Sequence, residues 1–284
     1  MPLGIDGNRS VDAGRTREPV EQVNPEDVPV FILAGGLGTR FREQTHAVPK
    51  PMINIDGRPI IWHIMSKYAS HGFRKFVICA GYKAEVIKDY FLNYQEINSD
   101  FTVDMRDKSV TFHSKQVENW SVTVAFTGAD AMTGYRIHNA TDRFLGDSPT
   151  FALTYGDGLT DVSLTEELKF HEAHGKIGTV LGIHPPARFG EILASGGLVS
   201  TFAEKKPLAA SWISGGFFFF NREFSSYVRD DEYLVLEESP LRNLVDDKQL
   251  MLFEHDGFWA CMDTQRDHDL LDNLARSGDA PWLR

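Results

Sequence analysis

The chain alternates short apolar runs with longer segments of helical periodicity, and this alternation restricts the fold more than any other feature of the sequence. Short runs rich in Val, Ile and Phe that stop at a Gly or a polar turn are typical of buried strands. Such runs occupy residues 28–34, 75–80, 151–154 and 178–183. Segments of helical periodicity lie between them, at residues 59–71, 84–94 and 163–174. The alternation predicts an α/β fold, a Rossmann-like mixed and mainly parallel sheet flanked by helices.

Residues 101–126 break this pattern, because polar and apolar side chains alternate along them with a period of two. That period predicts a small extra β region beside the main sheet. Two further strand-like runs and two helical stretches follow, at residues 198–203, 212–221, 237–246 and 264–277. A chain of 284 residues is long enough for one large α/β domain. We therefore expect residues 28–284 to form a single domain, with residues 198–284 as its C-terminal part.

The first 27 residues are polar, rich in Gly, Pro and charge, and lack the apolar segment that a secretion signal requires. We expect residues 1–27 to form a flexible N-terminal extension. The absence of any run of about 18 apolar residues predicts no membrane span. A formal net charge of −11 argues against nucleic-acid binding, which needs a basic face. The two cysteines, Cys79 and Cys261, fit a reducing cytoplasm better than a disulfide framework.

The first predicted strand runs directly into the glycine-rich loop GGLG at residues 35–38, which Thr39 and Arg40 follow. Three glycines within four positions let backbone amides approach a polyphosphate without obstruction by side chains. Thr39 can donate a hydroxyl group, and the guanidinium of Arg40 can neutralise phosphate oxygens. A plain glycine turn fits this loop alone equally well. A dinucleotide-binding fingerprint fits less well, because it needs a third glycine at another spacing and an acid after the second strand.

Lys50 lies between two prolines, ten residues after Arg40. Because proline restricts the backbone, this stiff segment presents a second cation near the same loop. Together the two segments resemble the sugar-1-phosphate nucleotidyltransferase family. Members of that family transfer a nucleoside monophosphate from an NTP to a sugar 1-phosphate and release pyrophosphate. The resemblance implies that the predicted α/β sheet is the nucleotidyltransferase fold, with its sugar-binding part within residues 198–284.

The resemblance covers nearly the whole chain from Val28, and it is closest to the family members that make CDP-glucose. The matching segments are long and unusual, and they include KPMINIDGRPIIWHIM, FVICAGYKAEVIKDYF, LTYGDGLTDV and HDGFWACMDTQRD. The resemblance implies transfer of CMP from CTP to glucose 1-phosphate. It also implies Mg²⁺ as cofactor and a cytoplasmic homo-oligomer, whose subunit contacts we expect within residues 101–126.

Two carboxylates from distant parts of the chain are the candidate Mg²⁺ ligands. Asp157 follows a predicted strand in the sequence TYGDG, and open α/β sheets bind ligands beyond the carboxyl ends of their strands. Asp263 lies in MDT, where a predicted helix begins. Carboxylate oxygens suit Mg²⁺, and the resemblance implies that both residues hold it. Taken alone, Asp157 also fits an Asp-Gly turn and Asp263 also fits a helix N-cap.

The resemblance assigns the remaining roles. In FAEKKP the family pattern Phe-x-Glu-Lys-Pro matches Lys205 to the lysine that contacts the sugar phosphate, and the additional Lys206 is the alternative. The catalytic residues would then be Arg40, Lys50 and Lys205. The nucleotide would contact Leu33, Ala34, Gly35, Gly36, Leu37, Gly38, Thr39, Thr127 and Arg136. The sugar phosphate would contact Lys205 together with Gly156, Trp212, Gly215 and Gly216.

One departure concerns Val48, where the family often carries a lysine. The change removes a cation near the phosphates, so GTP, UTP or dTTP and other sugar 1-phosphates stay open as substrates. A non-catalytic relative that only binds a nucleotide sugar is the second alternative. Such a relative is expected to have lost one of Arg40, Lys50, Asp157 and Asp263, and this chain keeps all four.

Overall fold

The structure is a computed structural model that describes residues 23–36, 38, 48–113, 118–184, 191–195, 198–203 and 212–284. Most of the predicted N-terminal extension therefore lies outside the described residues. Within them, η1 (Pro25–Asp27) leads into the first strand, and the backbone N–H of Val23 donates to Glu172 on the surface of the main body.

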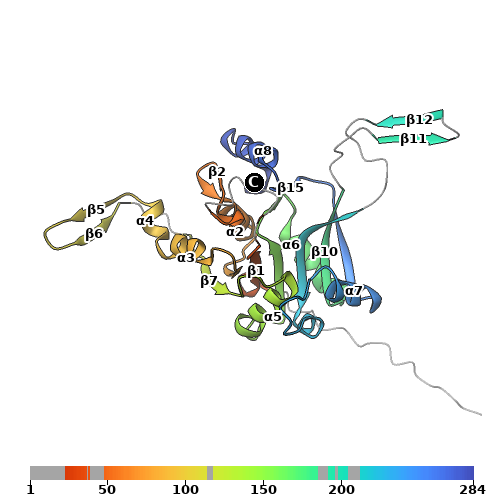
Figure 1. The fold of residues 1–284 in the computed structure, drawn as a ribbon, viewed down its shortest axis with the longest axis horizontal. Coiled ribbons are helices and arrows are strands. Elements are labelled where there is room, and N and C mark those ends of the chain that lie inside the picture. Colours follow the sequence, from red (N-terminus) through yellow and green to blue (C-terminus); the bar gives the residue numbers. More distant parts are fainter. Residues whose placement is uncertain are drawn as a thin grey trace, which may run out of the picture.

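A seven-stranded sheet forms the centre of the molecule, in the order β14-β10-β13-β8-β1-β4-β7 (Figure 1). Its strands are β1 (Pro29–Ala34), β4 (Lys75–Ala80), β7 (Ser121–Phe126), β8 (Thr150–Tyr155), β10 (Gly178–Ile183), β13 (Ile213–Asn221) and β14 (Leu250–His255). Neighbouring strands are parallel except at β13, which is antiparallel to both β8 and β10. The predicted Rossmann-like mixed, mainly parallel sheet is thus confirmed.

Successive side chains of a strand point to opposite faces, and both faces of this sheet are buried. Along β1, Val30 and Ile32 enter one hydrophobic core while Phe31 and Leu33 enter the other. The first core is covered by α2 (Ile60–Ser70), α3 (Ala84–Leu92), α6 (Leu164–His174) and α8 (Gln265–Arg276). The second is covered by η4 (Arg222–Tyr227), α5 (Thr133–Phe144) and α7 (Ser239–Asp246). This explains why the predicted strands read as continuous apolar runs.

The predicted extra β region is divided between two places. β5 (Phe101–Asp104) and β6 (Ser109–Phe112) form an antiparallel hairpin beyond α4 (Tyr94–Asn98), and Figure 1 shows it projecting from the main body. The last part of the region is β7, which is the edge strand of the main sheet. A second projecting hairpin consists of β11 (Glu191–Ser195) and β12 (Leu198–Ala203).

Short elements at the carboxyl edge of the sheet bring distant segments together. They are η3 (Lys50–Met52), β2 (Asn54–Ile55), β3 (Arg58–Pro59), β9 (Gly158–Thr160), β15 (Trp259–Cys261) and η5 (Pro281–Leu283). β9 directly follows the end of β8 and pairs antiparallel with β15, with Gly158 opposite Cys261. This pairing places the segment after β15 beside the segment after β8.

Candidate active site

Three charged side chains meet at the carboxyl edge of the sheet. Nζ of Lys50 lies 2.6 Å from Oδ2 of Asp157 and 2.7 Å from Oδ1 of Asp263. The two aspartates lie 107 and 213 positions from the lysine in the sequence. The lysine side chain is 12% exposed and the carboxylates are 25% and 28% exposed, so water screens these ion pairs less than surface pairs.

Each member of this cluster is held by local structure. Lys50 is the first residue of η3. The next two residues, Pro51 and Met52, are buried, and they fix the backbone that carries the Lys50 side chain. Asp157 follows β8, and its carbonyl oxygen accepts from the N–H of Met262 at 2.9 Å. That hydrogen bond aligns the chain on either side of β9 and β15, and it places Asp263 within reach of Lys50.

The helix α8 begins at Gln265, two residues after Asp263. Thr264 is its N-cap and forms a capping box with Asp267. The sequence left open that Asp263 itself caps this helix, and that alternative is wrong. The Asp263 carboxylate instead pairs with Lys50 while its backbone N–H donates to Asp267. Its side chain is therefore directed to the cluster and not to the helix end.

The charge state of Lys50 follows from two opposing effects. Burial tends to lower the pKa of Lys50, but the charge of Asp157 and the hydrogen bonds of both aspartates raise it more. The pKa of Lys50 consequently lies above its ordinary value. The group between the carboxylates is thus an ammonium ion at neutral pH.

A cavity of about 330 Å³ opens beside this cluster, within the range of small-molecule sites. The predicted nucleotide residues in its wall are Leu33, Ala34, Gly35, Gly36, Gly38 and Arg136. Lys50, Gly156, Asp157 and Asp263 line it as well. The tertiary structure thus brings together predicted residues from five separate segments. Leu37, Thr39, Arg40 and Lys205 lie outside the described residues, so their roles stay predictions.

Arg136 is a buried guanidinium behind the glycine loop. It donates to the carbonyl oxygens of Gly35 at 3.0 Å and Gly128 at 2.7 Å, and to Oγ1 of Thr127 at 2.9 Å. Thr127 in turn donates to the carbonyl of Ala80. Arg136 therefore braces the segments that follow β1, β4 and β7. Direct contact of Thr127 and Arg136 with a nucleotide stays a prediction.

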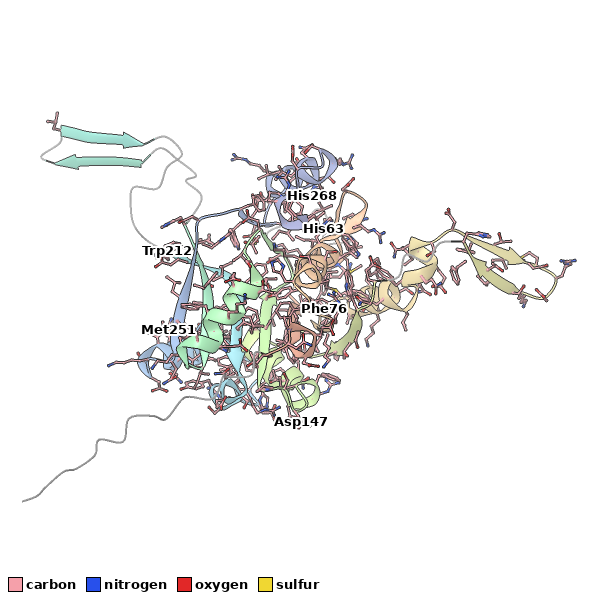
Figure 2. The ribbon with its side chains drawn as sticks, turned by 180° about the vertical axis from the view of Figure 1, so that it is seen from behind. His63, Phe76, Asp147, Trp212, Met251 and His268 are labelled. Atoms are coloured by element: carbon pink, nitrogen blue, oxygen red, sulfur yellow. The ribbon has the colours of Figure 1, made fainter. Side chains whose placement is uncertain are left out.

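Three predicted sugar contacts lie outside the cavity wall. The Trp212 ring stacks on His184 with 3.9 Å between ring centroids, on the side from which β11 and β12 project (Figure 2). The carbonyl of Gly215 accepts from the indole of Trp259 at 2.7 Å. Gly216 has φ +78°, and a Cβ atom there would collide with the Tyr155 ring. Gly216 thus acts on the cavity indirectly, by making room for Tyr155.

Sequence reasoning missed several residues of the cavity wall. Tyr155 and Thr133 both line it, and both donate a hydroxyl hydrogen bond to the carboxylate of Glu237. Tyr155 stands two positions before Asp157, which was a usable signal. Glu237 had none, because the sequence places it only at the start of a predicted helical stretch, with no motif around it.

The carboxylates fit a hard divalent cation. Two oxygen donors from separate segments face one point, and the ammonium of Lys50 already occupies that point as a stand-in cation. Cys261 lies beside them, and one ligand atom from each of Asp157, Cys261 and Asp263 falls within 4.8 Å of the others. Burial raises the pKa of the Cys261 thiol, so the thiol stays protonated at neutral pH and is the weaker candidate donor.

Comparison with known proteins assigns the family. Residues 30–264 match the family described as Nucleotidyl transferase. The chain belongs to this family. It is 44% identical over 251 residues to the glucose-1-phosphate cytidylyltransferase of Salmonella typhi, which covers 88% of this chain and 97% of that protein. It is 38% identical over 251 residues to a probable glucose-1-phosphate cytidylyltransferase of Bacillus subtilis, with the same coverage of 88% and 97%.

More distant matches carry other specificities in their names. A mannose-1-phosphate guanyltransferase of Saccharomyces cerevisiae is 27% identical over 250 residues, which are 85% of this chain and 62% of that protein. A solved structure of a putative glucose-1-phosphate thymidylyltransferase from Bacillus anthracis has a TM-score of 0.62 at 17% identity, and covers 88% of this chain and 95% of that one. This transferase is therefore built on the fold of that structure.

Proposed function

We propose that the protein transfers CMP from CTP to glucose 1-phosphate and so forms CDP-glucose and pyrophosphate. The observation that carries the proposal is the cluster of Lys50, Asp157 and Asp263 at a cavity of about 330 Å³ that the glycine loop lines. A lysine and two carboxylates at one point suit a metal-bound triphosphate. The choice of cytidine and glucose is supported by the relatives that carry this activity in their names at 44% and 38% identity.

The chemistry needs charge neutralisation and positioning more than proton transfer. The phosphate of glucose 1-phosphate is already ionised, so its oxygen attacks the α-phosphorus of CTP without a general base. The bond between the α-phosphorus and the bridging oxygen breaks, and pyrophosphate leaves with that oxygen. The enzyme aligns the two substrates and balances the charge that develops.

The residues of the chain divide this work. The amides of Gly35, Gly36 and Gly38 would receive the triphosphate, and Lys50 would donate to it. When bound, Mg²⁺ held by Asp157 and Asp263 would supply Lewis-acid activation of the phosphates. Arg40 would balance charge on the leaving group.

Lys205 would orient the sugar phosphate near Gly156. The predicted contacts of Trp212, Gly215 and Gly216 would require the sugar to reach beyond the cavity toward β13. These three stay predictions, because they lie outside the cavity wall.

We further propose that the enzyme works in the cytoplasm as a homo-oligomer, without nucleic-acid or membrane partners. Cys79 and Cys261 are both free thiols, which fits a reducing compartment. Among the described residues, no helix is long and apolar enough to cross a membrane. The projecting β5–β6 hairpin, with Phe101 and Val110 exposed, is where subunit contacts would form.

The test is a substrate panel. Pyrophosphate release is measured with each of CTP, GTP, UTP and dTTP against several sugar 1-phosphates, and the nucleotide sugar is identified by mass. We expect the highest kcat/KM with CTP and glucose 1-phosphate. A clear preference for GTP would favour the second candidate, a guanylyltransferase, which the 27% identical yeast relative makes the natural alternative. Asp157→Asn protein, purified in the same way, controls for contaminating activity.

A further inference from the structure

Lys50 occupies the point at which both candidate metal ligands converge. Its ammonium lies 2.6 Å and 2.7 Å from one oxygen of Asp157 and one of Asp263. Separations this short are those of charge-assisted hydrogen bonds, so the lysine contacts both carboxylates at once. Because the side chain is largely buried, surrounding water cannot easily take its place. The lysine therefore acts as an internal counter-ion of this acidic pair.

A divalent cation held by the same carboxylates would lie close to this ammonium group. Like charges at such a separation repel strongly where water is largely excluded. The oxygens that face Lys50 also cannot direct the same lone pairs to a hydrogen bond and to a metal ion. Coordination of an ion at that same point, through Oδ2 of Asp157 and Oδ1 of Asp263, thus requires the lysine to withdraw.

Withdrawal of the lysine has a large electrostatic cost unless another anion receives its ammonium group. Lys50 lines the cavity together with Gly35 and Gly36, whose backbone amides suit phosphate oxygens. A lysine ammonium is a compact charge on a flexible stem, so it can exchange one set of oxygens for another. The phosphates of a nucleotide are the anions that would reach it in this cavity.

We propose that Lys50 competes with the divalent ion for Asp157 and Asp263 until a nucleoside triphosphate draws the lysine away, so that metal and nucleotide bind cooperatively. This inference rests on the proposed function, since the cavity must receive a triphosphate. Linkage makes the effect reciprocal: nucleotide raises the affinity for metal by the same factor by which metal raises the affinity for nucleotide.

The experiment measures Mn²⁺ binding to the full chain by electron paramagnetic resonance, with and without α,β-methylene-CTP. Lys50→Met removes the charge at similar size. Without nucleotide, this variant should bind Mn²⁺ on the order of tenfold more tightly than the wild type, within the usual range of coupling between sites. Its coupling with the nucleotide analogue should fall by a similar factor. Lys50→Arg keeps the charge and should bind Mn²⁺ as weakly as the wild type.

A matched control removes a different lysine–aspartate pair. Lys75 is the first residue of β4, and it forms an exposed ion pair with Asp27. Lys75→Met breaks this pair and should leave Mn²⁺ binding unchanged. Thermal unfolding supplies a second readout if Lys50→Met is poorly stable. The Tm of that variant should fall without metal, because Asp157 and Asp263 then repel, and Mn²⁺ should restore it.

The outcomes separate this inference from the proposed function. Equal Mn²⁺ affinity of wild type and Lys50→Met without nucleotide overturns the inference and leaves the proposed metal ligands intact. If no protein binds Mn²⁺ even with the analogue, both fail. Tight Mn²⁺ binding by a Lys50→Met, Asp157→Asn double variant would place the ion elsewhere and also overturn the inference.

Discussion

At the scale of single residues, the absence of a side chain at Gly156 determines the shape of the cavity. A Cβ atom there would lie 2.8 Å from the carbonyl oxygen of Leu33 and 2.9 Å from Cγ of Pro51. Both neighbours belong to the cavity wall, and neither is the free end of a flexible side chain. Any other residue at position 156 would have to displace β1 or the segment that carries Lys50.

Gly156→Ala should therefore lower the free energy of unfolding by about 1–3 kcal/mol, as overpacking usually does. Denaturant unfolding at neutral pH measures this. Gly36→Ala is the matched control for stability, because a Cβ atom at Gly36 meets nothing within 4 Å. Equal losses in the two variants would contradict the steric argument.

The charge of Asp157 should matter far more for turnover than for folding. Asp157→Asn keeps the size of the side chain but removes half of the acidic pair that faces Lys50. We expect kcat/KM to fall by about 10²–10³-fold, the usual effect of losing one electrostatic contact in a transition state. The exposed Asp147, labelled in Figure 2, supplies the control, and Asp147→Asn should keep wild-type kcat/KM. Wild-type rates in Asp157→Asn would refute the assignment.

At the scale of elements, the strand ends depend on α5 for their arrangement. Arg136 reaches from this helix to the carbonyls of Gly35, Gly128 and Ala129. A Cβ atom at Gly35 or at Gly81 would collide with its guanidinium, so both glycines are needed to admit it. The glycine loop is thus shaped by the helix behind it as well as by any ligand in front.

Arg136→Lys should loosen this arrangement although it keeps the charge. A lysine cannot bond several carbonyls in fixed directions, and each buried carbonyl left unpaired costs about 1–3 kcal/mol. We expect lower stability together with a raised KM for the nucleotide. Arg143→Lys on the exposed face of the same helix is the control for both quantities. An unchanged KM in Arg136→Lys would show that the brace does not shape the nucleotide site.

The sequence predicted these elements well where the chain is apolar and regular. The predicted run 28–34 contains β1, and residues 75–80 and 178–183 are β4 and β10, because buried strands leave a continuous apolar run. Residues 101–126 show where pattern reading stops. Their period of two is the same in β5, β6 and β7, and only pairing decides that β7 joins the main sheet while the hairpin projects from it.

At the scale of the whole molecule, a polar cluster inside the body joins α6, β10 and β13. The Nδ1 atom of His171 pairs with Thr179 at 2.8 Å and its Nε2 atom with Asn221 at 2.9 Å. His174 contacts the same Thr179 hydroxyl at 2.7 Å. Both ring nitrogens of His171 are thus engaged within the protein. Burial lowers the pKa of His171 to about 4, with His174 as an additional nearby charge when protonated.

Stability should consequently fall as the pH drops from about 6.5 to about 4. Over this range the unfolded chain binds a proton at His171 that the folded chain does not. By about pH 4 the difference between the two pKa values corresponds to a loss of about 3 kcal/mol in the free energy of unfolding. Denaturant unfolding at several pH values measures the slope. His171→Gln removes the titrating ring and should flatten this part of the curve. An unchanged slope in that variant would assign the acid sensitivity to other groups.

The sequence by itself determined the α/β class, the glycine loop, and Lys50, Asp157 and Asp263 as candidates, because these follow from local periodicity and from short motifs. Only the tertiary structure decided that the lysine lies between the two carboxylates and that Arg136 braces three strand ends. It also showed that Trp212, a predicted sugar contact, lies outside the cavity wall and stacks on His184. Such facts depend on which strands pair and which loops share an edge of the sheet. A local stretch of sequence carries no information on contacts between residues that lie more than a hundred positions apart.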